Sequence, residues 1–145
     1  MRLTAHTDYG LRVLIALAAI NDRLVTIEEL SVRHRVSRNH LMKVAQTLVN
    51  LGLVKSVRGR RGGLTLAKRP ADIRMGSVVR ALEVDMELVS CLGDQPASCV
   101  FSGICRLTGA LRGAMESFFA ELDRLTLADL ASSPQNLRER LAVPV

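Results

Sequence analysis

The sequence predicts a mainly helical fold: a winged helix-turn-helix with a small two-stranded wing and a long C-terminal dimerisation helix. Aromatic residues make up only 3% of the 145 residues, while leucine, alanine and valine are abundant, as is typical of packed helices. Three helical stretches are followed by two strand-like runs around an arginine–glycine turn. A helical apolar repeat then occupies much of the C-terminal third. This length suits one compact domain with an arm.

The first three helices are expected near the N-terminus, at residues 7–20, 27–33 and 38–50. In the first, apolar residues recur at spacings of three and four and predict one buried stripe: Leu11, Leu14, Ile15, Ala18 and Ala19. Thr26 and Glu29 form the pattern of a capping box that opens the second helix. Ser37 can cap the third helix, whose polar N-terminal end we expect to be exposed.

A basic hairpin follows the third helix. The strand-like runs LVKSV and LTLA flank RGRRGG, whose glycines permit the positive φ of a hairpin turn. A short helix over 76–83 then closes the predicted winged helix-turn-helix domain, which spans 1–83 with its wing at about 53–67. Three further regions are expected: a cysteine-bearing loop at 84–103, a dimerisation helix region at 104–131 and a weakly ordered tail at 132–145.

The long C-terminal helix carries an apolar stripe made of Leu107, Leu111, Met115, Phe118, Leu122 and Leu125. A winged domain of about 80 residues cannot cover all of this stripe, so we expect a second copy of the chain to do so. A homodimer would also match a palindromic operator, whose two half-sites would each bind the winged helix-turn-helix domain of one subunit. The alternative is a helix that packs only on its own domain.

The charge of the chain favours nucleic acid as a partner. The formal net charge is +6, and 17 of the 20 basic residues are arginines, whose planar fork suits phosphates. Asn39 can form paired hydrogen bonds with adenine and Arg38 with guanine. The alternative is a basic surface that only meets solvent. The candidate DNA-binding residues are Ser37, Arg38, Asn39, His40, Lys43, Arg58, Arg60 and Arg61.

Other classes of protein fit the sequence less well. Arg12 interrupts the apolar run 11–20, which leaves it too short for a membrane span and poor as an export signal, so we expect a cytoplasmic protein. The histidines His6, His34 and His40 all fall in the helical N-terminal part, with no recognisable nucleophile and base arrangement. We therefore expect no enzymatic activity.

All three cysteines, Cys91, Cys99 and Cys105, lie in one short segment, at gaps of seven and five residues. An odd number of cysteines in a reducing compartment favours metal binding or thiol chemistry over disulfides. Structural zinc usually takes four nitrogen or sulfur ligands, so an iron–sulfur cluster with a fourth ligand from elsewhere fits better. The alternative is a thiol-redox or other metal-binding protein with free cysteines.

A family resemblance extends over nearly the whole chain. The three-cysteine loop carries it together with four stretches: MRLTAHTDYGLRVLIALA, VSRNHLMKV, LGLVKSVRGRRGGLTLAK and CRLTGALRGAMESFFAELDRLTLADL. The chain resembles the winged-helix iron–sulfur repressors of the NsrR, IscR and RirA type. The resemblance implies that Cys91, Cys99 and Cys105 ligate a [4Fe-4S] or, alternatively, a [2Fe-2S] cluster. It also implies that Asp8 of the partner subunit completes the ligand set.

The resemblance implies a homodimeric repressor that binds a palindromic operator and releases it when its cluster is nitrosylated. The stretches TDYGLR, SRNH and ELDRLTLADL are most similar to the nitric-oxide-sensitive members of the family. The seven-residue gap between Cys91 and Cys99 is instead more like that of the iron-responsive members. Because these three stretches support it, nitric oxide is the expected signal. Iron availability, which the gap supports, is the alternative.

Overall fold

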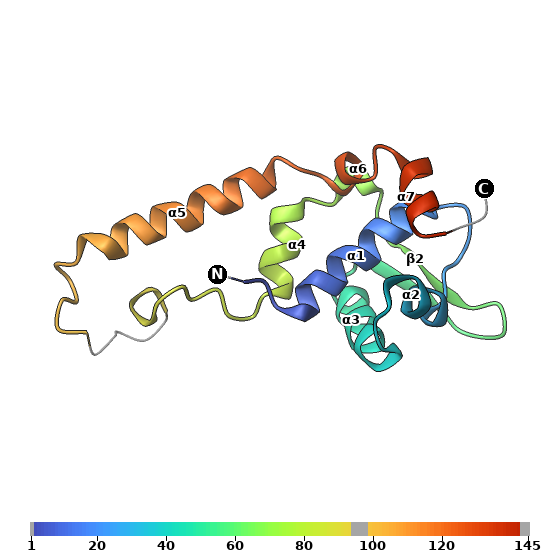
Figure 1. The fold of residues 1–145 in the computed structure, drawn as a ribbon, viewed down its shortest axis with the longest axis horizontal. Helices are drawn as coiled ribbons and strands as arrows, with labels where there is room; N and C mark the ends of the chain where they lie inside the picture. The colour runs from blue at the N-terminus through green and yellow to red at the C-terminus, as the bar shows by residue number, and fades with distance from the viewer. Residues whose placement is uncertain (1, 94–98, 143–145) are drawn as a thin grey trace.

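The structure, a computed structural model that describes residues 2–93 and 99–142, has a winged-helix body and a projecting arm (Figure 1). It confirms the predicted mainly helical winged-helix fold. Two short 3₁₀ helices accompany the α-helices and the strands. The elements are α1 (Ala5–Ala19), α2 (Ile27–His34), α3 (Arg38–Asn50), β1 (Val54–Val57), β2 (Gly63–Leu66), η1 (Pro70–Asp72), α4 (Met75–Leu82), η2 (Ser90–Leu92), α5 (Arg106–Asp123), α6 (Leu127–Leu130) and α7 (Pro134–Arg140).

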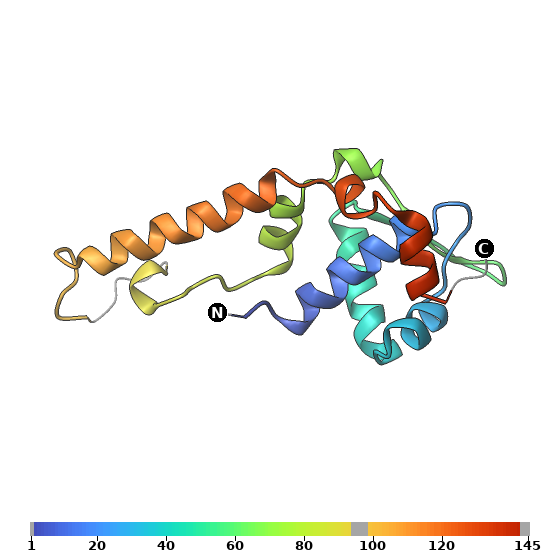
Figure 2. The same cartoon turned by 45° about the horizontal axis from the view of Figure 1, so that its top comes forward.

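Helix α1 runs through the middle of the body, between α3 on one side and α6 on the other (Figures 1 and 2). It begins two residues before the predicted start, because the Thr4 hydroxyl accepts a hydrogen bond from the Thr7 amide at 3.3 Å. Its burial extends well beyond the single predicted stripe, since helices pack around it on several sides. The buried apolar residues of α1 are Val13, Leu14, Ala16, Leu17, Ala18 and Ala19.

The wing is an antiparallel hairpin in which Val54 pairs with Leu66 and Val57 with Gly63. Its turn depends on glycine: Gly59 has a φ of 110°, and a Cβ on Gly62 would lie 2.2 Å from the Val57 carbonyl oxygen. The hairpin extends from the end of the body that lies away from α5 (Figures 1 and 2). This places the wing and the cysteine segment at opposite ends of the protomer.

The arm consists of the chain that leaves α4 and of α5, which returns toward the body (Figure 1). Phe119 is the one buried residue of α5. Leu107, near the far end, is 61% exposed. The other five residues of the predicted stripe are partly buried in the protomer: Leu111, Met115, Phe118, Leu122 and Leu125. The part of the stripe that the protomer leaves uncovered is thus its far end, at Leu107. None of the helices in the described ranges is long and apolar enough to cross a membrane.

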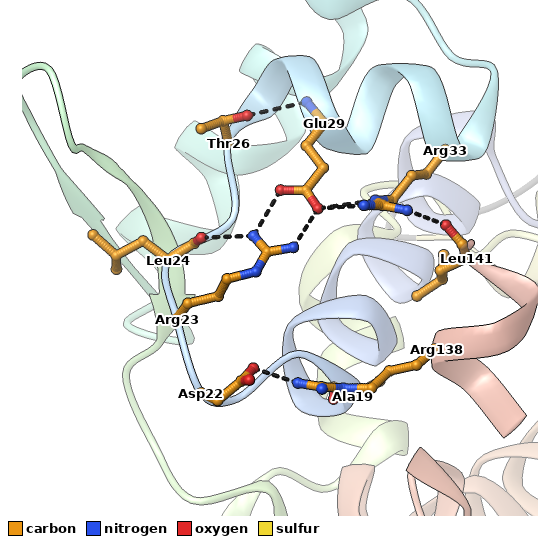
Figure 3. Close-up of polar contacts among 9 residues, drawn as sticks. All are labelled: Ala19, Asp22, Arg23, Leu24, Thr26, Glu29, Arg33, Arg138 and Leu141. Carbon is orange, nitrogen blue, oxygen red and sulfur yellow. Dashed lines mark hydrogen bonds and ion pairs between the residues drawn. The ribbon is translucent and has the colours of Figure 1, made fainter. Parts of the chain in front are cut away.

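The C-terminal segment differs from the weakly ordered tail predicted for 132–145, because its described part forms α7, which packs on α1. The Arg138 guanidinium donates a hydrogen bond to the Ala19 carbonyl oxygen at 2.8 Å and pairs with Asp22 (Figure 3). These contacts satisfy a carbonyl at the end of α1. Leu127 of α6, fully buried, also joins the core, so the body draws on residues beyond the predicted 1–83.

Candidate nucleic-acid interface and cysteine segment

Helix α3 presents its N-terminal end to solvent, as the sequence predicts. The Ser37 hydroxyl caps the helix by accepting a hydrogen bond from the His40 amide at 3.3 Å. Arg38 is exposed and forms an ion pair with Glu28 of α2, with 3.0 Å between Nε and the carboxylate. A surface pair of this kind contributes little stability and opens readily when a phosphate or a base competes for the guanidinium.

The outward face of α3 also carries two residues outside the predicted DNA-binding set. The ring of His40 turns toward α1, with its centroid 6.2 Å from that of Tyr9. Met42, which is 54% exposed, and Gln46 lie three and seven residues after Asn39, a helical spacing that places all three on one exposed face. Neither Met42 nor Gln46 is among the predicted DNA-binding residues, although their spacing from Asn39 can be read in the sequence.

The second basic group lies at the tip of the wing. Arg58, Arg60 and Arg61 are all exposed there, held by the glycine turn. Arginines on a narrow hairpin can enter a minor groove or grip the phosphates beside it. The wing and α3 belong to the same body, since Leu64 of β2 exchanges backbone hydrogen bonds of 2.8 and 3.0 Å with Val25, just before α2.

The cysteines lie on the arm, and two of them contact the same residue. The Cys91 sulfur lies 3.5 Å from the Thr108 hydroxyl oxygen. Cys105 occupies the N-cap of α5, where the backbone amide and then the hydroxyl of Thr108 lower the pKa of its thiol, with the Leu107 amide adding to the effect. Cys99 is exposed. The structure therefore brings Cys91 and Cys105 to Thr108 and leaves Cys99 apart.

A complete metal site does not form within the described part of the protomer. No three His, Cys, Asp or Glu side chains in the described ranges are grouped so that they could hold a metal ion. The donor chemistry still fits an iron–sulfur cluster, because thiolates are soft ligands and the position of Cys105 at a helix N-terminus favours its thiolate. Asp8 is half exposed in the first turn of α1, where it pairs with Arg12 at 2.8 Å.

The comparisons with known proteins agree with this architecture. Residues 3–133 match a family model described as "Rrf2: Iron-dependent Transcriptional regulator". The chain belongs to the Rrf2 family. It is 42% identical over 142 residues to the HTH-type transcriptional regulator NsrR of Geobacillus kaustophilus, which covers 97% of both chains. NsrR of Bacillus subtilis is also 42% identical over 142 residues, with the same coverage of both chains.

Solved structures of Rrf2 regulators share the fold. The T. potens IscR structure superposes with a TM-score of 0.73 at 26% identity and covers 95% of this chain and 91% of that one. The oxidised form of Staphylococcus aureus CymR superposes with a TM-score of 0.74 at 24% identity, and the match covers 90% of this chain and 96% of the CymR chain. The chain is thus a DNA-binding transcriptional regulator of the Rrf2 family and not an enzyme, as the sequence predicts.

Proposed function

We propose that this Rrf2 regulator is a homodimeric repressor that holds an iron–sulfur cluster and releases its operator when nitric oxide reacts with that cluster. The observation that carries the proposal is the 42% identity to NsrR regulators over nearly the whole chain. The iron dependence in the description of the family points to the same class of cofactor.

Dimerisation and operator binding are supported by the shape of the protomer. Leu107 is exposed at the far end of α5 and the rest of its apolar stripe is only partly buried, so the helix offers a surface for a second copy, and two copies present two winged bodies to DNA. A palindromic operator is the matching partner of such an arrangement. Asn39 and Arg38 would contact bases, while Ser37, His40 and Lys43 lie beside them and the wing arginines contact the minor groove or phosphates.

Cys91, Cys99 and Cys105 would hold the cluster, with Asp8 of the partner subunit as the fourth ligand, and [4Fe-4S] is the favoured form over [2Fe-2S]. When bound, the cluster supplies iron that reacts with nitric oxide. Asp8 is suited to its role because a carboxylate is a harder ligand than a thiolate and exchanges more readily. Its exposed position in the first turn of α1 leaves it accessible to a second copy.

Iron availability is the second candidate signal, favoured by the seven-residue gap between Cys91 and Cys99. Residues 94–98 of this gap lie outside the described residues. The two signals separate in one experiment: an anaerobic spectroscopic titration with nitric oxide beside the same titration with an iron chelator, each followed by operator binding. If operator DNA is released at a low concentration of nitric oxide but only at a high concentration of chelator, the result supports the proposal. Release at low chelator but only at high nitric oxide supports iron sensing.

The cluster itself is tested by anaerobic purification. We expect a brown protein that shifts operator DNA in a gel and loses the shift when nitric oxide is added. A colourless protein that cannot be reconstituted with iron and sulfide, yet binds DNA specifically, would contradict the cluster mechanism. That result would favour a thiol-redox protein instead.

The DNA contacts are tested by two sets of alanine variants. Replacement of Arg58, Arg60 and Arg61 should weaken binding to all sequences and reduce its salt dependence, because phosphate contacts are lost. Asn39→Ala should instead relax specificity at one base position at a cost of about 1–3 kcal/mol. Binding is measured by fluorescence anisotropy over a salt series, and equal behaviour of the two sets would contradict this division of roles.

A further inference from the structure

The junction between arm and body includes a backbone contact and a side-chain contact. The first is a backbone contact at the C-terminal end of α5, where the Met75 amide donates to the Leu125 carbonyl oxygen at 3.0 Å and the Leu127 amide donates to that of Ile73 at 2.9 Å. One such attachment fixes where α5 ends but leaves its direction free. A second contact, away from the first, is needed to hold the direction of the arm.

The second contact joins α4 to α5 through side chains. Arg80 of α4 donates two hydrogen bonds of 2.8 Å to the Asp123 carboxylate in a fork geometry. The same guanidinium lies over the ring of Phe119, 4.2 Å from its centroid. Phe119 is the one buried residue of α5, and these three residues, here called the arm clamp, form a side-chain contact between the arm helix and α4.

The surface of α4 is shaped to receive the clamp. A Cβ on Gly76 would lie 2.0 Å from an Asp123 carboxylate oxygen, so the carboxylate sits where any larger residue would put its side chain. The other side of α4 is fixed to the body, where Leu82 packs against Gly10 of α1 so closely that a Cβ on Gly10 would lie 2.7 Å away. The clamp therefore joins α5 to a helix, α4, that is itself packed firmly on the body.

We infer that the arm clamp sets the angle between arm and body and, in the dimer, the spacing of operator half-sites that the two bodies accept. The inference rests on the proposed function, because it takes α5 as the dimer contact. The 18 residues of α5 span roughly 27 Å, so a change of about 10° at its base moves its far end by about 5 Å. That displacement exceeds the rise of one base pair, about 3.4 Å.

The energy of the pair agrees with a positioning role. The side chains of Arg80 and Asp123 are 45% and 41% exposed, and ion pairs this exposed contribute little to stability. Loss of the clamp should therefore leave the fold and the single winged body intact. What it should change is how well two bodies fit one palindrome.

The test compares half-site and full-site binding. An operator is first obtained by selection from a random double-stranded library with the wild-type full-length protein, prepared anaerobically. Variants of the operator then differ by one or two base pairs between the half-sites. The protein variants are Arg80→Gln and Asp123→Asn, and the matched control is Arg124→Gln, whose partner Glu121 lies 3.3 Å away on the same helix. Ultracentrifugation and thermal melting check that each variant is folded and dimeric.

We expect the clamp variants to bind half-site DNA like wild type, to bind the full palindrome about ten-fold more weakly and to discriminate less between spacings. The control should keep the wild-type preference. An unchanged spacing preference in both clamp variants would overturn the inference. An equal loss of affinity for half-site and full-site DNA would also overturn it. If either variant does not fold or dimerise, Arg80→Lys decides, because it keeps the charge but not the fork.

The same experiment separates this inference from the proposed function. A wild-type protein that is monomeric, or that selects no palindrome, contradicts the proposed homodimeric repressor. A wild-type dimer with a spacing preference that survives loss of the clamp contradicts only the role of Arg80, Asp123 and Phe119.

Discussion

Glu29 shows how one residue can have a role that its sequence pattern does not predict. The Thr26 hydroxyl accepts from the Glu29 amide at 3.1 Å, which is half of the predicted capping box. The Glu29 carboxylate does not accept from the Thr26 amide, as the other half of the box requires. It accepts hydrogen bonds from Arg23 at 2.8 and 2.6 Å and from Arg33 at 2.9 and 2.7 Å (Figure 3). Chiefly through Arg23, the pKa of Glu29 falls to about 2.

This pKa predicts how stability depends on pH. The pKa of Glu29 is lower in the folded chain than the ordinary value of 4.5, so its contribution is complete above that value and is lost as the pH falls toward 2. Glu29→Gln should lower the free energy of unfolding at pH 7 by on the order of 2 kcal/mol. Urea unfolding at several pH values measures this. The difference from wild type should narrow below pH 4.5; a difference that stays constant with pH would contradict the role of the charge.

At the scale of elements, the wing depends on its turn. Gly62→Ala would bring a Cβ to 2.2 Å from the Val57 carbonyl oxygen, and neither backbone can move without breaking the β1–β2 pairing. We expect operator affinity to fall at least ten-fold, about 1.4 kcal/mol, while the melting temperature of the body changes little. Ser56→Ala, on the exposed side of β1, is the control. Normal affinity of the Gly62 variant would show that the wing does not contact DNA.

The elements also show which features local sequence can predict. Helices α2 and α3 begin where Thr26 and Ser37 predict, because a cap and its helix lie within four residues of each other. Helix α7 was missed because its anchor, Arg138, bonds to Ala19 across 119 positions. The candidate site divides in the same way. The exposed wing arginines follow from a local turn, whereas the shared contact of Cys91 and Cys105 with Thr108 depends on tertiary folding.

At the scale of the whole molecule, α7 is part of the structural support of the body. A chain that ends at Ser133 loses the Arg138 contacts and the hydrogen bond from Arg33 to the Leu141 carbonyl (Figure 3). We expect a loss of stability of about 2–4 kcal/mol, measured by urea unfolding. Arg140→Gln, which changes an exposed charge of α7, is the control. A truncated chain as stable as the full one would mean that α7 only rests on the surface.

The dimer has its own test on α5. Leu107→Asp places a charge on a residue that is 61% exposed in the protomer, so the variant should fold normally. If α5 forms the dimer contact, burial of that charge should shift the protein toward monomer in sedimentation experiments. Arg106→Gln, one residue earlier and exposed, should stay dimeric. A dimeric Leu107 variant would place the contact elsewhere.

The central position of α1 has a consequence for synthesis of the protein. This helix is synthesised before the arm, yet two of the elements that cover it, α6 and α7, are synthesised after the whole arm. The nascent chain must therefore hold α1 with part of its apolar surface open until α6 and α7 have been synthesised. A message cut short before the codon for Leu127 would yield a body without its complete core. The core of the body is complete only when α6 and α7 have followed the arm.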